Sequence, residues 1–409
     1  MLRREAKMKD VGIVMPVYKQ DPLYLELALK SVLDQSYPNY HFVIVSDGAP
    51  SETVDVIKEM TEGDERVHLI LKKDNEGVAK TLNIGFDYLM GIEEVKYLTW
   101  VSSDNIYYPT FVAKLKNALE TAPNDVGLSF SSFRHIDRDG NFLKEPSLEQ
   151  FYKYQNQPKE NLLEVCFIGV SFMYKRDLAK EIGGYRLEPV EDYDYWLRLT
   201  EKCEIVYIED VLMEYRKNSP LSLSAQLKSS IDQHRRWRYA FNLAKQEARN
   251  RRNIPFMLTV IYPVENGSVQ TIEKLEALFE QTYSNYKVII IDRSVDQSAI
   301  NVLKHIEDPR VKFIALSGAS EDKSIRSGMK EANTPFTLIY GKSVFPSTNT
   351  VLYNFFNFYN HLTQQKVINK KVVIFDKGKG AIGYAVVQSE QEWVFGHLYN
   401  TGKLAEILT

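Results

Sequence analysis

The sequence predicts an α/β protein built on a doubly wound sheet. Short apolar runs rich in branched residues alternate with helix-like segments, which is typical of parallel strands connected by helices. The runs that we expect to be strands are VGIVMPVY (11–18), HFVIVSD (41–47), VHLILK (67–72) and YLTWVSS (97–103). The segments that we expect to be helices are 23–34, 51–60 and 78–90.

The second half of the chain partly repeats the first. DQSYPNYHFVIVSDGAP (34–50) returns as EQTYSNYKVIIIDRSVD (280–296), and DERVHLIL (64–71) returns as DPRVKFIA (308–315). A weaker echo of YLTWVSSDN stands at 336–344. Copies of this length are too long for solenoid units and are better explained as domains.

We therefore expect two domains. The first covers 1–250, and the second, a smaller α/β domain at 254–409, resembles a degenerate copy of the first. The polar, basic stretch RNRRN at 249–253 is expected to end a helix and to link the two. Beyond 366, glycines interrupt short apolar runs, which predicts short strands joined by turns.

Composition narrows the class of protein. The 51 lysines and arginines nearly balance the 54 acidic residues, which argues against nucleic acid as a partner. No apolar stretch approaches the roughly 20 residues of a membrane helix, and the charged N-terminus is unlike a signal peptide. Two cysteines, Cys166 and Cys203, fit a reducing compartment. The expected location is the cytoplasm.

Two acids follow strands of the predicted sheet. Asp47 ends the second strand, and Asp104 follows the fourth. Ligands of doubly wound sheets bind in the crevice beyond the carboxyl ends of the strands, so both acids are candidates for a binding site. In the repeat, Arg293 stands in place of Asp47 and Ser343 falls near the position of Asp104. The second copy therefore keeps the apolar strands and loses the acids.

Several further motifs come in an order that resembles the family 2 glycosyltransferases of the GT-A fold, closest to the spore-coat polysaccharide type. The resemblance covers about 10 to 225, and its motifs are VGIVMPVYKQ, SVLDQSYPNYHFVIVSDGAP, NEGVAKTLNIGF, VSSDNIYYP, FIGVSFMYKRDLAKEIGGY and EDYDYWLRL. It implies a mixed sheet and an inverting transfer from a nucleotide sugar, often a UDP-sugar, with Mn²⁺ or Mg²⁺.

The expected metal ligand is Asp104. A divalent cation would neutralise the sugar diphosphate and stabilise the departing UDP, and phosphate oxygens supply most of its ligands. The family usually has a pair of acids here, and Ser103 occupies the position of the first. The family pattern Tyr-Arg-x-His, whose His can bind the metal, becomes YRKN with Asn218 at that position. The alternative for Asp104 and Asn105 is a simple turn.

The resemblance implies a nucleotide-binding loop at Pro16, Val17 and Tyr18, where the Tyr18 ring could cover the base. It also implies that Asp47 accepts a hydrogen bond from the base, although Asp-Gly is by itself a common turn.

DNEGVAK (74–80) follows the third strand and belongs to the same set of motifs. Asn75 is expected to contact the nucleotide, and Lys80 is expected either to reach the diphosphate as a point charge or to lie exposed on a helix.

The catalytic base is expected in PVEDYDYW at 189–196. The resemblance implies an acid pair that matches Glu191 and Asp192, with Asp192 as the base and Glu191 as the second choice. A carboxylate base accelerates such a transfer by roughly 10² to 10⁴. The competing explanation is helix capping, because proline and acids favour the first turn of a helix and Asp194 is spaced to pair with Arg198. Trp196 is expected in the core.

The basic segment 234–252 has apolar residues at helical spacing. It is interpreted either as a solvated helix packed on the domain, which we favour, or as a contact with an anionic membrane surface or an acidic acceptor. The second domain is expected to position a large acceptor or to form a homodimer.

The function predicted from the sequence is transfer of a hexose from a UDP-sugar to a hydroxyl of a saccharide or of a glycan on a protein. One alternative is a non-catalytic nucleotide- or glycan-binding protein. A sugar nucleotidyltransferase is disfavoured, because the loop after the first strand, MPVYKQDP, has neither glycine nor arginine.

Overall fold

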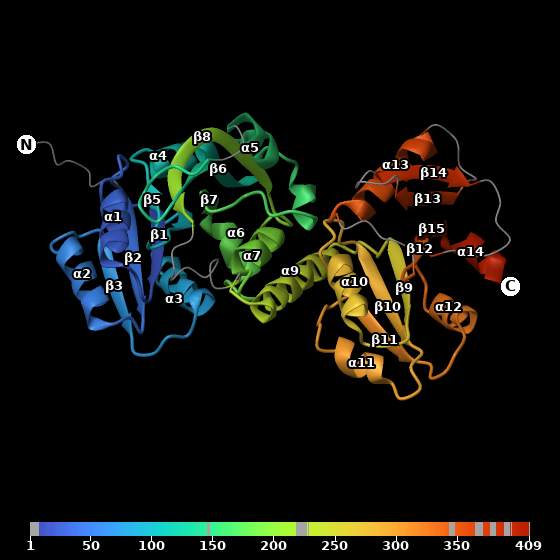
Figure 1. Cartoon of the computed structure of the whole chain (residues 1–409). Helices are drawn as coiled ribbons and strands as arrows, with labels where there is room; N and C mark the ends of the chain where they lie inside the picture. The colour runs from blue at the N-terminus through green and yellow to red at the C-terminus, as the bar shows by residue number, and fades with distance from the viewer. Residues whose placement is uncertain are drawn as a thin grey trace, which may run out of the picture. The chain divides into compact units, whose positions relative to one another are not determined.

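The computed structural model divides into two units, Met1–Trp237 and Arg238–Thr409 (Figure 1). It describes residues 8–144, 148–217, 227, 229–342, 348–364, 371–376, 382–387, 393 and 395–408.

The first unit is organised by one mixed sheet. Its described strands are β1 (Val11–Val17), β2 (Tyr40–Asp47), β3 (Val67–Lys72), β4 (Tyr97–Trp100), β5 (Ile106–Tyr107), β6 (Val126–Ile136), β7 (Phe172–Lys175) and β8 (Glu204–Arg216). Their order is β3-β2-β1-β4-β7-β6-β8-β5. The first four strands are parallel, and β7 enters antiparallel between β4 and β6.

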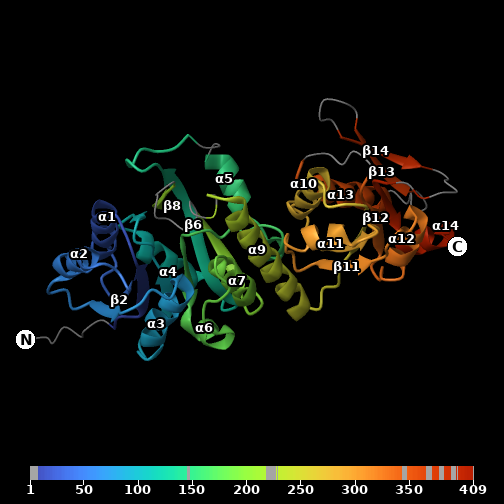
Figure 2. The ribbon, with the colours of Figure 1, turned by 60° about the horizontal axis from the view of Figure 1, so that its bottom comes forward.

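Helices cover both faces of this sheet. They are α1 (Pro22–Leu33), α2 (Ser51–Thr61), α3 (Val78–Met90), α4 (Phe111–Thr121), α5 (Leu148–Gln155), α6 (Arg176–Ile182) and α7 (Glu191–Leu199), with a 3₁₀ helix at Lys159–Leu163. Apolar residues of α1, α2 and α4 form a core with one face of the sheet. Helix α3 packs on the other face, where a Cβ on Gly85 would come within 2.5 Å of Val14 (Figures 1 and 2). Burial on both faces explains the continuous apolar runs of these strands.

The predicted elements are confirmed closely. Helix α3 and strand β3 have the expected bounds. Strands β1 and β2 and helix α2 differ by one residue at one end, and α1 is shifted by one residue at both ends. The largest difference is in the fourth strand, because β4 ends at Trp100 and a turn at Ser103–Asp104 follows it. Asp104 therefore lies in a turn beyond the strand.

The second unit contains its own sheet. Its described strands are β9 (Leu258–Val264), β10 (Tyr286–Asp292), β11 (Val311–Ala315), β12 (Phe336–Ile339), β13 (Lys371–Asp376), β14 (Ile382–Val387) and β15 (His397–Asn400), in the order β11-β10-β9-β12-β15-β13-β14. Its helices are α10 (Val269–Phe279), α11 (Ser298–Leu303), α12 (Glu321–Met329), α13 (Val351–Gln364) and α14 (Thr401–Leu408).

The first four strands of this sheet follow the order of the first sheet. The strands β11, β10, β9 and β12 are parallel, as are β3, β2, β1 and β4, and an antiparallel strand comes next in both. Val264 pairs with Asp292 as Val17 pairs with Ser46, so Arg293 takes the position of Asp47. The derivation of the second unit from the first stays a prediction, and this shared order supports it.

Helix α9 (Ile231–Arg251) crosses the division between the units. The boundary therefore lies earlier than the linker expected at 249–253, because the second half of α9 packs within the second unit. Arg238 pairs with Glu276 and Glu280, and Asn242 Nδ2 donates to Asp308 at 2.8 Å. These buried polar residues of α9 are used inside the protein, as the interpretation of a packed helix predicts. In the described part of the chain, no helix combines the length and the apolarity of a membrane span.

Candidate functional site

The site residues predicted from the sequence gather at one edge of the first sheet. Strands β1 to β4 are parallel, so their carboxyl ends lie at the same edge. Asp47 is in register with Lys72, the last residue of β3. Tyr18 follows β1 with 41% of its surface exposed, which leaves its ring available to a ligand.

Asp47 is buried and holds the loop that follows β3. It forms an ion pair with Lys72, and its carboxylate accepts hydrogen bonds from the backbone N–H groups of Glu76 (3.0 Å) and Gly77 (3.1 Å). Burial opposes the charge of Lys72, but its bonds to Asp47 and Glu76 leave its pKa raised. Lys72 was missed in the sequence, where its only signal is its place at a strand end.

Gly48 allows this loop to approach. Its φ of +66° is unfavourable for other residues, and a Cβ there would lie 2.7 Å from the backbone nitrogen of Asn75. Asn75 is thereby adjacent to the end of β2. Lys80, in contrast, has a side chain that is 68% exposed and lies 3.4 Å from Glu76. Its position matches the exposed-helix alternative and leaves the diphosphate role untested.

Asp104 is buried in the turn after β4. Ser102 Oγ donates to its Oδ1 at 2.6 Å, and only 7% of the residue is exposed. Burial raises the pKa of Asp104, and the Ser102 hydrogen bond opposes the shift. Ser103 Oγ accepts from Gln20 Nε2 at 3.1 Å, so the loop after β1 contacts this turn.

Arg216, the last residue of β8, fixes the same turn. Its Nε donates to the backbone oxygen of Asp104 at 3.1 Å, and its backbone N–H donates to Asn105 Oδ1 at 2.9 Å. Its guanidinium lies 4.1 Å from the ring centroid of Tyr24. Asn218, the second predicted metal ligand, lies outside the described residues, as does Ser343.

The acid pair begins helix α7. Glu191 Oε2 and Asp192 Oδ1 are buried and accept no hydrogen bond from the described residues. Burial raises the pKa of Glu191 to about 7, and the charge of Glu188 adds to the shift. Burial also raises the pKa of Asp192 well above its usual range, the charge of Glu191 raises it further, and the indole of Trp100 opposes both. Trp100 ends β4, so Asp192 and the turn of Asp104 flank the same strand end.

Ion pairs account for a different acid of this helix, Asp194. Asp194 Oδ2 accepts from Arg198 Nε at 2.8 Å, and its carboxylate also pairs with Arg186. The predicted Asp194–Arg198 pair is thus confirmed, and Trp196 is fully buried, as expected for the core. The capping position itself, Val190, has no side-chain cap. Capping therefore does not account for the unbonded oxygens of Glu191 and Asp192.

Glu188 ties the acid pair to the loop after β3. Its Oε1 accepts from the backbone N–H of Ala79 at 2.7 Å, at the start of α3. A Cβ on Gly77 would come within 2.6 Å of the same oxygen. Glu188 was missed in the sequence, because its partner lies more than a hundred residues away and no local pattern predicts the contact.

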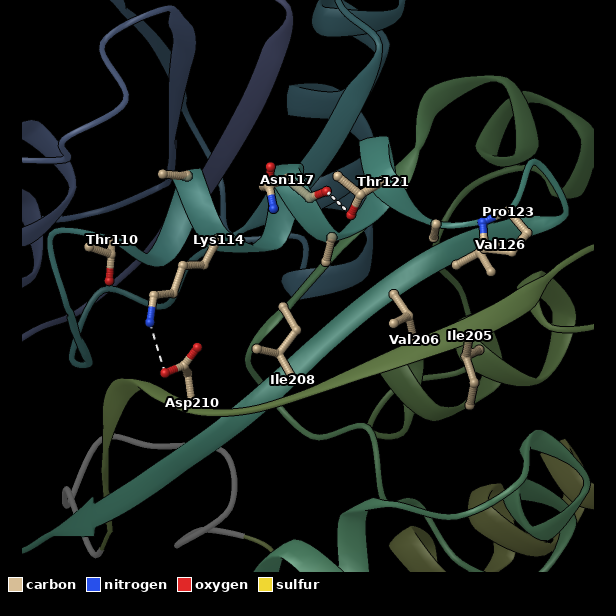
Figure 3. A pocket seen from close by; sticks show the side chains of 13 residues that line it. Thr110, Lys114, Asn117, Thr121, Pro123, Val126, Ile205, Val206, Ile208 and Asp210 are labelled. Atoms are coloured by element: carbon tan, nitrogen blue, oxygen red, sulfur yellow. Dashed lines mark hydrogen bonds and ion pairs between the residues drawn. The ribbon is translucent and has the colours of Figure 1, made fainter.

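A cavity of about 660 Å³ lies elsewhere on the first unit, between α4 and β8 (Figure 3). It is lined largely by apolar and small side chains, with an ion pair of 2.8 Å between Lys114 and Asp210 at one end. None of the predicted site residues lines it. The candidate site is accordingly the edge of the sheet at which Asp47, Asp104 and Asp192 gather.

Comparison with known families agrees with this location. The model of the family described as "Glycosyl transferase family 2" matches residues 12–183, a stretch that includes β1 to β4 and their loops. The chain carries a glycosyltransferase family 2 domain. The acid pair at Glu191 and Asp192 lies outside the matched residues, which end at Gly183.

Curated proteins similar to this chain are named as glycosyltransferases. An uncharacterized glycosyltransferase of Rickettsia bellii is 23% identical across 79% of this chain and 51% of its own length. The O-antigen biosynthesis glycosyltransferase WbnJ of Escherichia coli is 27% identical across 50% of this chain and 79% of its own. This chain spans about half of the length of the Rickettsia bellii relative.

Solved structures also overlap with the chain. The mannosyltransferase PcManGT from Pyrobaculum calidifontis, in complex with GDP-Man and Mn²⁺, has a TM-score of 0.43 at 17% identity and covers 59% of this chain and 64% of its own. TarS 1–349 of S. aureus in complex with UDP has a TM-score of 0.43 at 12% identity, and the overlap covers 57% of this chain and 65% of the TarS chain.

Proposed function

We propose that the family 2 domain is an inverting glycosyltransferase that moves a hexose from a UDP-sugar to a hydroxyl of a saccharide or of a glycan on a protein. The observation that carries this proposal is the pair of buried, unbonded carboxyl oxygens of Glu191 and Asp192 beside the strand end that leads to Asp104. Unpaired buried carboxyls are costly, and they are typical of catalytic sites.

Asp192 is the proposed general base. The acceptor hydroxyl attacks the anomeric carbon from the face opposite UDP, its proton passes to Asp192, and the bond to UDP breaks with its electrons on the phosphate oxygen. A raised pKa makes the carboxylate a stronger base once it is deprotonated. Glu191 is the second choice for this role, and its charge strengthens the basicity of Asp192.

The nucleotide is proposed to bind along the carboxyl ends of β1 to β4. Pro16, Val17 and Tyr18 would cover the uracil, and Asp47 and Asn75 would meet its polar edge from β2 and the following loop. Support comes from the exposure of Tyr18 and from the fixed position of the Asp47 carboxylate. Lys72 is the cation nearest to this carboxylate and is a better candidate than Lys80 for holding negative charge at the site.

Asp104 fits the role of a single protein ligand to Mn²⁺ or Mg²⁺. Its carboxylate accepts a hydrogen bond from Ser102, and burial raises its pKa in spite of that bond and of the charge of Arg216. Ser103 would contact the ribose or the metal, and Asn218 remains a proposed second ligand.

Among the residues that the structure describes, no group of three or more acidic, histidine or cysteine ligands occurs, so phosphate oxygens would complete the coordination. The metal would stabilise the charge on departing UDP.

The cytoplasmic location, the peripheral membrane contact and the homodimer stay predictions. The same holds for the role of the second unit in positioning an acceptor.

A screen of UDP-sugars tests the proposal. The purified chain is incubated with Mn²⁺ and each donor, with and without simple saccharide acceptors, and released UDP is measured. We expect UDP release from one donor or a few, and its loss with EDTA. Calorimetric binding of UDP without any turnover across the panel would favour the non-catalytic alternative.

A further inference from the structure

The second unit has a cavity at the same sheet edge that forms the candidate site in the first. Its volume is about 210 Å³, and it lies at the carboxyl ends of β9, β10 and β12 beside the starts of α10 and α12. The register of the strands gives Arg293 the position of Asp47 and gives Lys342 the position of Ser103. The positions that Asp47 and Ser103 hold in the first unit are therefore cationic in the second unit.

Three cations line this cavity. Arg293 Nε donates to the backbone oxygen of Ala319 at 2.8 Å, and its Nη1 lies 3.0 Å from Glu265 and 3.4 Å from Glu321. Lys342 pairs with Glu321, and Lys274 donates to the backbone oxygen of Gly341. Among the described residues that line the cavity, two carboxylates face three cations, which leaves an excess of positive charge there.

The present partner of Arg293 indicates which chemical group could bind in the cavity. Arg293 is anchored through Nε, and its Nη1 points at the carboxylate of Glu265, whose side chain is 60% exposed. An exposed ion pair contributes little to stability, so a ligand oxyanion can replace this carboxylate against the same nitrogen. Phe395 adds an aromatic wall, and Asn266 and Gln270 add amides.

We propose that this cavity binds the phosphate or carboxylate group of a small saccharide, directly and without a metal ion. In the first unit the corresponding edge carries the acids Asp47 and Asp104, and a nucleotide bound there would need a metal ion at Asp104. In the second unit Arg293 and Lys342 supply the positive charge themselves, and arginine matches the two oxygens of such groups. The volume is below that of pockets for drug-sized ligands, so the ligand is small. This inference does not depend on the proposed transfer reaction.

The test measures binding to the full chain by calorimetry with EDTA present, at an ionic strength of about 0.15 M, where exposed charges are largely screened. The probes are glucose 6-phosphate, glucuronate and glucose. We expect binding of the phosphate, the carboxylate or both, and no binding of glucose. Binding of all three with equal affinity, or of none, would overturn the proposal. The two anionic sugars decide which oxyanion is preferred.

Two variants locate the site. Arg293→Gln should weaken binding by about tenfold or more, because a charge-assisted hydrogen bond is lost. Glu265→Gln should strengthen it, because the competing carboxylate is removed while Arg293 remains. This second variant keeps the proposal testable if Arg293→Gln does not fold. Unchanged affinity in both variants would mean that the anion binds elsewhere.

Lys312→Gln serves as the matched control. Lys312 is also a partly exposed cation paired with a glutamate, Glu331, but it lies on β11 and does not line the cavity. The affinity of this variant should equal that of the original chain. A loss as large as that of Arg293→Gln would show that binding follows the total charge rather than this cavity.

Discussion

The two units share their internal supports and differ at the edges of their sheets. In the first unit Tyr40 OH donates to a backbone oxygen of α1, and the guanidinium of Arg66 lies 4.7 Å from the Tyr40 ring centroid. In the second unit Tyr286 OH donates to a backbone oxygen of α10, and Arg310 lies 4.2 Å from its ring. The same side chains thus fix the second strand of each sheet to the preceding helix.

A glutamine repeats the same correspondence. Gln35 donates to a backbone oxygen just before α4 and accepts from a backbone N–H in its first turn. Gln281 makes the same two bonds at the start of α13. These residues form hydrogen bonds with buried backbone groups, and the loss of such bonds is costly. Asp47 and Arg293 also bind neighbouring backbone groups, but with opposite charges. Asp47 accepts from the N–H groups of Glu76 and Gly77, whereas Arg293 donates to the oxygen of Ala319. The comparison teaches that scaffold and chemistry vary separately in this chain.

Of the substitutions that would test this difference between the units, Asp104→Asn should have the largest effect on activity. Asp104→Asn removes the only carboxylate in the turn after β4 and should reduce metal-dependent UDP release to background, because a metal supplies several kcal/mol of charge stabilisation. Asp55→Asn, the same change on the exposed surface of α2, is the control and should have normal activity. Full activity of Asp104→Asn would remove the metal assignment.

The second effect concerns the base. Asp192→Asn should slow transfer by roughly 10²- to 10⁴-fold. The affinity for UDP, measured by calorimetry, should stay within about twofold of that of the original chain. The reason is that a base acts only in the chemical step. Weak UDP binding combined with normal turnover at saturation would contradict this role.

The third effect compares the shared supports. Arg310 and Asp308 form a nearly inaccessible ion pair, whereas Arg66 and Asp64 are each 22% exposed at their side chains. Arg310→Ala should cost about 3–5 kcal/mol in the second unit, and Arg66→Ala about 1 kcal/mol or little more in the first. Hydrogen exchange of peptides from each unit in urea measures both costs separately. Equal costs would mean that burial does not set the strength of the two pairs.

The smallest effect is a pH dependence at Glu191. Its pKa is about 7 in the folded protein and about 4.5 in the unfolded chain, so the folded state retains a proton that the unfolded state loses between these values. Glu191 therefore lowers the free energy of unfolding as pH rises through this window. Glu191→Gln should raise the free energy of unfolding by at most about 3 kcal/mol above pH 7 and should hardly change it at pH 4. Urea unfolding at the two pH values measures this difference. A gain independent of pH would contradict the burial argument.

Much of the fold could be predicted because it follows from local pattern. The alternation of apolar runs and helical segments gave the bounds of α3 and nearly those of β1 to β3. The site was predicted only where a residue stands at a strand end or in a motif, as Asp47 does. Lys72, Gln20 and Glu188 were missed, because their contacts join segments that are distant in the sequence.

The sequence by itself determined the order of strands and helices, the repeat and the membership of 12–183 in family 2, because periodicity and motif order are written along the chain. Only the tertiary structure decided which acids are satisfied. Asp194 is paired by two arginines, whereas Asp192, two residues earlier, has a buried oxygen without a hydrogen-bond partner in the described structure. Both acids look alike in the sequence, and the cost of burying each depends on which elements fold against it.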